Sequence, residues 1–313
     1  MISVVLALGH AAAWAAMSSS TTWEPLPPRA ASEPPRQVLL HNFYDTQIPY
    51  ADAWDCQRRL LGERTAALKA KSASSGADVL IALQHPPVLT LGTSSTIDNV
   101  LSSSDPPFDL FRTERGGEVT YHGPGQIVLY PLLDLRAYRQ DVHWYMRALE
   151  EVVIRTLGSL GLPAGREPGL TGVWVDGAKA CAIGVKLSRW VSMHGLALNV
   201  EPDLEHFGHI VPCGIADKPV TSIAELLRER GYDAGGAPLL ERVQRLLLQH
   251  FAEVFECELE EQPRGAAPRE LLGAASGSRG STDEAVLAGG TEIGKAVADT
   301  NTEHLEWFGE DGY

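Results

Sequence analysis

Cysteine is scarce in this chain, with four in 313 residues, and no two of them have the short spacing of paired metal ligands or of a disulfide framework. Small secreted domains that depend on disulfides need several closely spaced cysteines. The sequence therefore predicts reduced thiols in a compartment outside the secretory pathway.

Signals for nucleotides, nucleic acids and membranes are also missing. The chain has no Gly-x-x-x-x-Gly-Lys-Ser/Thr phosphate loop, and Gly123-Pro124-Gly125 lacks the third glycine of a dinucleotide fingerprint. Acidic residues outnumber basic ones by 40 to 26 and no basic stripe occurs. The apolar run over residues 2–16 is too short to span a membrane. We therefore expect no cofactor, no nucleic acid partner and no membrane insertion.

Composition divides the chain into three parts. Residues 1–36 contain no acid before Glu24 and many hydroxyl and small residues, which favours an organelle transit peptide although arginines are few. Residues 37–258 are long enough for one well-buried domain. Residues 259–313 carry 11 acidic and 4 basic side chains among many Gly, Ala and Ser, and are predicted to be a disordered tail.

Strand-like and helix-like patterns alternate within residues 37–258. Asp141 precedes apolar residues that recur at helical spacing up to Gly161, and Ser222 with Glu225 forms a capping box. This alternation predicts an α/β fold with a mixed sheet layered by helices. We expect helices at 50–72, 141–160, from 222 onward and at 238–255, and strands at 79–83, 88–91, 127–133, 180–187 and 196–198.

The most informative segment is a glycine-rich run, Arg115-Gly116-Gly117-Glu118-Val119-Thr120-Tyr121-His122-Gly123-Pro124-Gly125-Gln126. Glycines at this density let the backbone approach a ligand closely, and polar groups between strand-like segments are typical of a binding pocket. A tight hairpin that merely turns the chain is the alternative interpretation. Arg115 could likewise be a surface partner of Glu114 or Glu118.

A lysine and a cysteine further along the chain could form a reactive pair. Asp176-Gly177 predicts a two-residue hairpin turn, which places Lys179 near the mouth of the buried strand that follows. Cys213 lies between a proline and a glycine, in a loop that can expose its thiol. Only a thiolate attacks a carbonyl, and a neighbouring ammonium favours that anion. Each group would therefore prepare the other if the fold brings them together.

Two alternatives concern the same region. Cys181 is two residues from Lys179 and would point to the same face of a strand, so it competes as the nucleophile, although a small buried residue is the simpler interpretation. His206, His209 and Cys213 have a spacing that could hold zinc. Three ligands without a fourth are incomplete, so no metal is expected.

These motifs resemble one family, the octanoyltransferases of lipoate biosynthesis, also called lipoyl(octanoyl) transferases. The resemblance covers about residues 38–258 in the same order, and segment 107–199 resembles most the plastid-type enzymes of the green lineage. It is carried by the glycine-rich run, by Lys179 before Ala182-Ile183-Gly184, by His194-Gly195-Leu196-Ala197-Leu198-Asn199 and by Pro212-Cys213-Gly214-Ile215.

The resemblance implies the biotin/lipoate protein ligase catalytic fold and a ping-pong transfer. Cys213 would take an octanoyl group from octanoyl-acyl carrier protein as a thioester, with Lys179 as its partner. The expected acceptors are the lipoyl domains of 2-oxoacid dehydrogenase E2 subunits and the glycine cleavage H protein. The implied substrate-binding residues are Arg115, Gly116, Gly117, Glu118, Val119, Thr120, Tyr121, His122, Ala182, Ile183, Gly184, Gly195, Leu196 and Ala197.

Two other functions stay open. A related ATP-dependent lipoate or biotin ligase would bind a nucleotide and would not need Cys213. A scaffold without catalysis would bind acyl carrier protein or lipoyl domains and form no acyl adduct. Because the core is of the plastid type, we expect the chloroplast as the location, with the mitochondrion as the alternative.

Overall fold

The computed structural model describes residues 23–29, 32–71, 76–101, 107–211, 218–232 and 235–264. Most of the expected leader and of the acidic tail lie outside these ranges, as does Cys213, the candidate nucleophile. The limits of the leader and of the tail therefore stay predictions.

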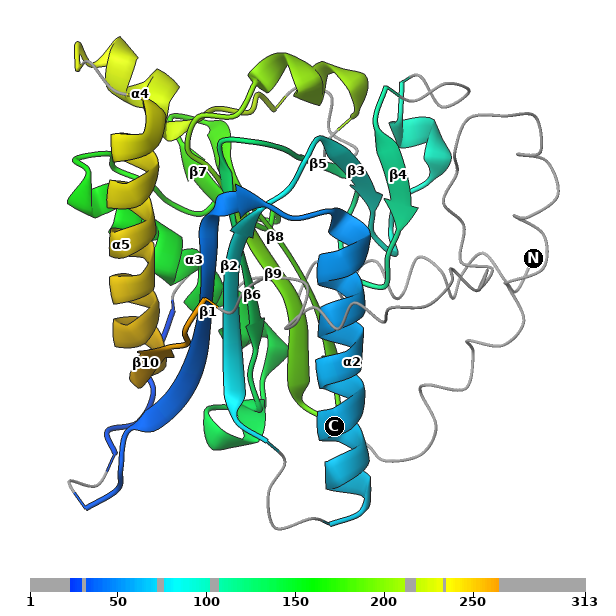
Figure 1. Ribbon diagram of the computed structural model, residues 1–313. Coiled ribbons are helices and arrows are strands. Elements are labelled where there is room, and N and C mark those ends of the chain that lie inside the picture. The colour runs from blue at the N-terminus through cyan, green and yellow to red at the C-terminus, as the bar shows by residue number, and fades with distance from the viewer. Residues whose placement is uncertain are drawn as a thin grey trace, which may run out of the picture.

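A seven-stranded mixed sheet forms the centre of the protein, in the strand order β10-β1-β2-β6-β9-β8-β7 (Figure 1). Strands β10, β1 and β2 are parallel, and every further pair in that order is antiparallel. The central strands are buried and rich in branched apolar residues, which suit a pleated interior. The strands are β1 Arg36–Gln47, β2 Asp78–Gln84, β6 Gln126–Leu132, β7 Val173–Val175, β8 Ala178–Ser188, β9 Val191–Asn199 and β10 Cys257–Glu261.

Helices cover both faces of this sheet, which confirms the predicted α/β architecture (Figure 1). Helices α3 and α5 pack together on one face, and α2 lies on the other. None of the helices in the described ranges is both long and apolar enough to cross a bilayer. The helices are α2 Tyr50–Lys69, α3 Val142–Ser159, α4 Ile223–Glu229 and α5 Gly236–Phe255, with 3₁₀ turns η1 Ile97–Asn99, η2 Leu135–Ala137 and η3 Leu204–His209.

Two of the helices begin at the predicted capping residues. The Asp141 carboxylate accepts hydrogen bonds from the backbone N–H groups of His143 and Trp144, at 2.9 and 3.1 Å. The Ser222 hydroxyl accepts one from the N–H of Glu225 at 3.2 Å. Each bond satisfies a donor that has no partner within its own helix, so the capping prediction is confirmed.

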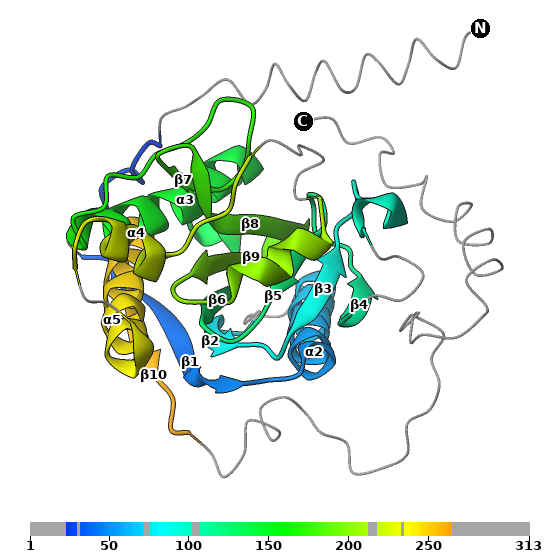
Figure 2. The same cartoon turned by 90° about the horizontal axis from the view of Figure 1, so that it is seen from above.

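A second, three-stranded sheet lies beside α2, with the order β4-β3-β5 (Figure 2). It consists of β3 Val88–Leu91, β4 Asp109–Arg112 and β5 Thr120–His122. Tyr50 and Trp54 of α2 pack against Phe111 of β4, with ring centroids 5.2 and 6.4 Å apart. The glycine-rich run therefore starts at the small sheet, passes through β5 and enters the large sheet at β6. Strand β3 was predicted, whereas the short β4 and β5 were not.

Residues 23–29 pack on the domain, although they belong to the expected leader. Leu26 is buried in the main core. The backbone carbonyl of Glu24 accepts a hydrogen bond from Nε1 of Trp144 at 2.9 Å, and the Arg155 guanidinium lies 5.0 Å from the ring centroid of Trp23. These contacts attach the segment to α3.

The hairpin between β7 and β8 fixes where Lys179 emerges. Asp176 and Gly177 have φ angles of 51° and 81°, and Val175 pairs with Ala178 across the turn. Positive φ at both central positions is what the two-residue turn requires, which explains the Asp-Gly pair. The predicted hairpin is confirmed.

Candidate functional site

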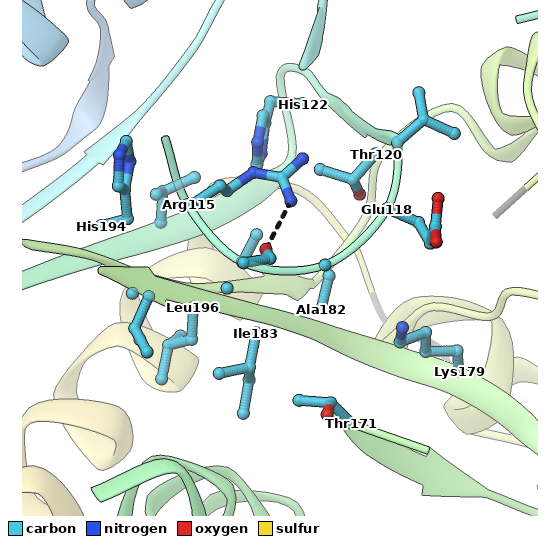
Figure 3. Close-up of a pocket in the computed structure, with 18 of the residues that line it drawn as sticks. Arg115, Glu118, Thr120, His122, Thr171, Lys179, Ala182, Ile183, His194 and Leu196 are labelled. Atoms are coloured by element: carbon cyan, nitrogen blue, oxygen red, sulfur yellow. Dashed lines mark hydrogen bonds between the residues drawn. The ribbon is translucent and has the colours of Figure 1, made fainter. Parts of the chain in front are cut away.

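A cavity of about 380 Å³ lies between the glycine-rich run and strands β8 and β9 (Figure 3). Cavities of this size hold small-molecule ligands. Further walls come from β6, from the first turns of α3 and from residues 169–171. Figure 3 shows Lys179 and His194 toward opposite ends of the group of side chains that surrounds it.

Of the predicted site residues that the structure describes, all but one lie at this cavity. Tyr121 is the exception, because side chains alternate along β5 and its ring packs in a separate apolar cluster on the other side. Its hydroxyl lies 2.7 Å from Nδ1 of His206. The prediction that Tyr121 lines the site is therefore wrong. The cavity is lined by Arg115, Gly116, Gly117, Glu118, Val119, Thr120, His122, Lys179, Ala182, Ile183, Gly184, Gly195, Leu196 and Ala197.

The floor of the cavity is apolar and belongs to one antiparallel strand pair. Ala182 pairs with Ala197 and Ile183 with Leu196 across β8 and β9. Gly184 follows Ile183 along β8, and a Cβ there would come within 3.1 Å of Cδ of Arg115. A floor of this kind can hold an alkyl chain, since each buried methylene contributes roughly 0.8 kcal/mol.

The glycine-rich run covers this floor as an anchored loop. The N–H of Gly116 donates to the Val185 carbonyl at 3.0 Å, and the N–H of Thr93 donates to the Arg115 carbonyl at 2.9 Å. A Cβ at Gly92 would lie 2.1 Å from the carbonyl oxygen of Gly117. The backbones therefore approach more closely than any side chain allows, and the alternative of a simple tight hairpin is wrong.

Arg115 is buried at the roof of the cavity, with 7% of its surface exposed. Its Nη2 donates to the carbonyl and to the hydroxyl of Thr90, at 2.8 and 2.9 Å. The carboxylates suggested as its surface partners are turned elsewhere, with Glu118 accepting from Asn99 at 3.0 Å. The interpretation of Arg115 as a surface ion-pair residue is therefore wrong.

A chain of buried hydrogen bonds runs from His122 toward Lys179. The amide nitrogen of Asn199 donates to the Thr221 carbonyl at 3.0 Å, so the Asn199 oxygen accepts from Gln126 at 2.9 Å. The side-chain oxygen of Gln126 then lies 2.7 Å from Nδ1 of His122. Because this oxygen can only accept, Nδ1 must carry the imidazole proton. The N–H of Thr221 in turn donates to the Lys179 carbonyl at 3.0 Å.

The two histidines beneath the glycine-rich run are neutral at ordinary pH. Burial lowers the pKa of His122 to about 3. Burial also lowers the pKa of His85 to about 4, although its hydrogen bond to the Ile48 carbonyl at 2.6 Å opposes the shift. Both imidazoles therefore act as hydrogen-bonding groups of fixed tautomer rather than as charges.

We predict that these histidines make the fold sensitive to acid. In the unfolded chain each imidazole takes up a proton below its ordinary pKa of about 6.5, whereas the folded protein keeps them neutral down to about pH 4 and about pH 3. The contribution of these two histidines to the free energy of unfolding should be fully present above about pH 7. It should fall progressively as the pH drops from about 6.5 toward 4. Denaturant midpoints measured across this range check the slope.

Imidazole NMR signals provide the second readout for this prediction. The His122 signals should not titrate between pH 5 and 8 in the folded protein. A His122 titration with a midpoint near 6.5 would contradict the buried neutral form.

His194 closes the other end of the cavity in an uncommon backbone conformation. Its φ is 58°, and its N–H donates to Oε1 of Gln57 at 2.8 Å, which fastens the strand to α2. Burial lowers the pKa of His194, while Glu114, whose carboxylate lies 3.8 Å from Nε2, opposes that shift. Burial raises the pKa of Glu114, but His194 and Lys186 lower it more, to about 2.

Lys179 stands at the start of β8 and lines the cavity. Its N–H donates to the Pro219 carbonyl at 2.8 Å, and its backbone forms a bridge with Val220. Its Nζ lies 5.4 Å from the ring centroid of Trp174. An ammonium near an aromatic face gains a cation–π contact.

The described residues on both sides of the Cys213 segment are anchored. Val211 donates its N–H to the Asn99 carbonyl at 2.8 Å, and Ile210 forms a bridge with Val100. On the other side, Pro219 and Val220 pair with the start of β8, as described above. Cys213 itself lies outside the described residues.

Cys181, the competing nucleophile, lies in the main core and not at the cavity. It is fully buried, and burial raises the pKa of its thiol. Across β7 and β8, Val173 pairs with Cys181, but the next residue, Trp174, pairs with Lys179. This register shift interrupts the regular alternation of β8 between Lys179 and Cys181. The prediction that Cys181 and Lys179 share one strand face is therefore wrong.

The zinc alternative has little support in the described part of the chain. Within it, no group of three His, Cys, Asp or Glu side chains could hold a metal ion. The rings of His206 and His209 pack on Phe108 instead, with centroids 4.8 and 5.8 Å apart. The third suggested ligand, Cys213, lies outside the described residues.

Several cavity residues were missed because their sequence context carries no signal. Tyr50 begins α2, Tyr130 lies in the middle of β6 and Met146 follows the ordinary apolar period of α3. Thr171 precedes the Val-Trp-Val strand, a segment that the family resemblance could have marked. The further lining residues are Tyr50, Ser94, Gln126, Val128, Tyr130, Val142, Met146, Gly169, Leu170, Thr171, Val185, His194, Asn199, Phe207 and Val220.

Comparison with known proteins gives consistent matches. A family model described as the lipoyl protein ligase A/B catalytic domain matches residues 49–252. An octanoyltransferase of Arabidopsis thaliana, named as chloroplastic, is 46% identical over 233 residues, covering 73% of this chain and 82% of the relative. An octanoyltransferase of Nostoc punctiforme is 48% identical over 235 residues, covering 74% and 96%.

A solved structure extends the comparison to the fold. A bi-partite lipoate protein ligase from Thermoplasma acidophilum, described with its E2 lipoyl domain, matches with a TM-score of 0.52 at 15% identity. The match covers 75% of this chain and 89% of that one. At this identity the similarity concerns the fold alone, and it confirms the expected lipoate ligase type of fold.

Proposed function

Since the chain belongs to the octanoyltransferase family, whose catalytic domain is that of the lipoyl protein ligases A and B, we propose that it transfers an octanoyl group from octanoyl-acyl carrier protein to a lysine of a lipoyl domain. The family establishes that the protein is a transferase for octanoyl groups in lipoylation. The donor, the acceptor and the thioester intermediate are the proposed part.

One observation carries the proposal. Lys179 lies at an apolar-floored cavity, and its backbone pairs with Pro219 and Thr221, just beyond the segment that contains Cys213. An octanoyl chain needs an apolar slot, and its carbonyl needs a nucleophile and a proton carrier at one end of that slot. The floor of Ala182, Ile183 and their β9 partners supplies the slot.

We propose that the transfer proceeds through two acyl exchanges. The Cys213 thiolate attacks the thioester carbonyl of the donor, a carbon–sulfur bond forms, and the carrier thiol leaves with a proton from the Lys179 ammonium. The acceptor lysine then attacks the new thioester, its proton passes to the now neutral Lys179, and the Cys213 thiolate is expelled. The ion pair is thereby restored, and no nucleotide is consumed because a thioester is already activated.

The acceptor and the location are proposed by analogy with the relatives. The Thermoplasma ligase is described with an E2 lipoyl domain, which supports lipoyl domains of E2 subunits and of the related glycine cleavage H protein as acceptors here. The chloroplastic relative supports a plastid location. If a transit peptide is removed, cleavage should fall before Trp23, because Trp23 and Glu24 are packed on α3. N-terminal sequencing of the imported protein tests this, and a mature start after Trp23 would contradict it.

The direct test is mass analysis of the acylated protein. After incubation with octanoyl-acyl carrier protein alone, the intact protein should gain one octanoyl group, and peptide mapping should find it on Cys213. Addition of a lipoyl domain without ATP should remove the group and transfer it to the domain. An absolute requirement for ATP, or binding of both partners without any adduct, would instead support a ligase or a scaffold.

A further inference from the structure

Glu150 is a charged side chain that is completely buried, although it lies outside the cavity. It belongs to α3, and its exposed fraction is 0%. The other charged side chains that the structure describes as buried, such as Arg64, Arg115 and Asp134, keep 6 to 8% of their surface exposed. A buried carboxylate persists only where charges and hydrogen bonds compensate its desolvation.

Each oxygen of Glu150 has its own partners. Oε2 accepts hydrogen bonds from Nη1 of Arg147 at 2.5 Å and from Nε of Arg166 at 2.8 Å. Oε1 accepts a hydrogen bond from the backbone N–H of Gly172 at 3.2 Å. The Arg166 guanidinium is held further by the Arg147 carbonyl and by Glu151, both at 3.0 Å.

These bonds fasten both ends of one segment, residues 166–172, which we name the strap. Arg166 is its first residue and Gly172 its last, and both contact the same carboxylate. Between them, Gly169, Leu170 and Thr171 line the cavity. Figure 3 shows Thr171 on the same side of the cavity as Lys179. The carboxylate therefore determines where this wall of the cavity lies.

Gly172 connects the strap to Lys179. Its φ is 120°, and a Cβ on it would come within 2.7 Å of Cε of Lys179 and 2.5 Å of the Cys181 carbonyl oxygen. The Gly172 backbone therefore packs directly against the end of the lysine side chain. The Glu150 carboxylate holds the N–H of Gly172. A displacement of that carboxylate must therefore also move the Gly172 backbone, against which the Lys179 side chain packs.

We propose that Glu150 is a positioning residue, whose carboxylate holds the strap through Arg166 and Gly172 and thereby orients the Lys179 ammonium in the cavity. The proposal rests on the proposed function, in which Lys179 exchanges protons with the thiol and the amine. Glu150 itself touches neither substrate nor reacting atoms. Its effect on the rate comes from geometry, to which proton transfer and attack are sensitive.

The variant Glu150→Gln tests this role, because glutamine keeps the volume and can still accept from Gly172 but lacks the charge that holds Arg166. The acylation rate at saturating octanoyl-acyl carrier protein should fall roughly 10- to 100-fold, since a displacement of about 1 Å can cost that much. The KM for the donor should stay within a few-fold of that of the wild type. The pH dependence of the rate should also shift, because the surroundings of Lys179 change.

Asp78→Asn is the matched control. Asp78 forms a comparably buried ion pair with Arg64 at 2.7 Å, and its other partners, Asp134 and Tyr138, do not line the cavity. This variant should lose stability as Glu150→Gln does and keep the wild-type acylation rate and pH profile. Rates are compared per folded molecule, so that loss of folding is not counted as loss of catalysis.

Gly172→Ala provides a second test of the same contact, both by itself and in combination with Glu150→Gln. Gly172→Ala should slow acylation by itself. In the double variant with Glu150→Gln, the fold-decrease in acylation rate should be smaller than the product of the two single fold-decreases, because both substitutions act through one contact. In the double variant with Asp78→Asn, the fold-change in acylation rate should equal the product of the two single fold-changes. A wild-type rate and pH profile in Glu150→Gln, or independent effects of the first pair, would overturn the proposal.

The outcomes also separate this inference from the proposed function. If Lys179→Ala acylates at the wild-type rate, the proposed function fails and Glu150 has nothing to position. If Lys179→Ala is slow while Glu150→Gln is as fast as the wild type, the proposed function stands and only the inference about Glu150 is overturned.

Discussion

Replacing Cys213 by serine is expected to abolish the octanoyl adduct and to lower turnover by about four to six orders of magnitude. Serine has nearly the same size, but its hydroxyl is almost never ionised at neutral pH, so the attacking anion is lost. Removal of a covalent nucleophile from an enzyme of this kind has effects on that scale. Steady-state transfer to a lipoyl domain and intact mass of the enzyme measure the two losses.

Cys181→Ala is the control for this variant. Cys181 is fully buried in the main core and does not line the cavity, so its removal should cost some stability and leave both adduct and turnover in place. If instead Cys181→Ala lost the adduct and Cys213→Ser kept it, the assignment of the nucleophile would be reversed.

The second large effect is expected for Lys179→Ala, which should slow acylation roughly 10²- to 10⁴-fold. The ammonium favours the thiolate and donates a proton to the leaving thiol, and both contributions disappear with the side chain. Deacylation by the acceptor should slow as well, since the Lys179 amine is no longer there to take the proton of the acceptor lysine. Rapid-quench measurement of the two half-reactions separates these steps.

Lys218→Ala is a control with the same change of charge. Lys218 also lies near the ring of Trp174, at 5.7 Å from its centroid, and pairs with Glu167 at 3.3 Å, but it does not line the cavity. Its removal should change each half-reaction by no more than a few-fold. Equal losses in the two variants would mean that the reaction does not depend on Lys179 in particular.

Much of the fold could be predicted because its signals are local. The apolar period of α3, the cap at Asp141 and the Asp176-Gly177 turn depend on residues within a few positions of one another. The short strands β4 and β5 were missed, since they lack the unbroken run of apolar and β-branched residues that marks β3. The glycine-rich run was identified as a binding loop for the same local reason, from its composition.

The directions of side chains could not be predicted with the same success. Tyr121 faces away from the cavity, Arg115 is buried beside Thr90, and Cys181 is turned into the core by an irregular pairing. Each depends on a register or a neighbour from a distant part of the chain. A change of one residue in register turns every side chain of a strand to the other face.

By itself the sequence determined the chemical inventory of this protein, that is, a thiol, an amine, close-packed glycines and small apolar residues in a fixed order. Only the tertiary structure decided that Lys179 lies on an apolar-floored cavity beside Thr171 and that Glu150, far from any motif, holds the wall behind it. The physical reason is that propensities and caps act over neighbouring residues. Distances between segments are set by how sheets and helices bury their apolar faces together.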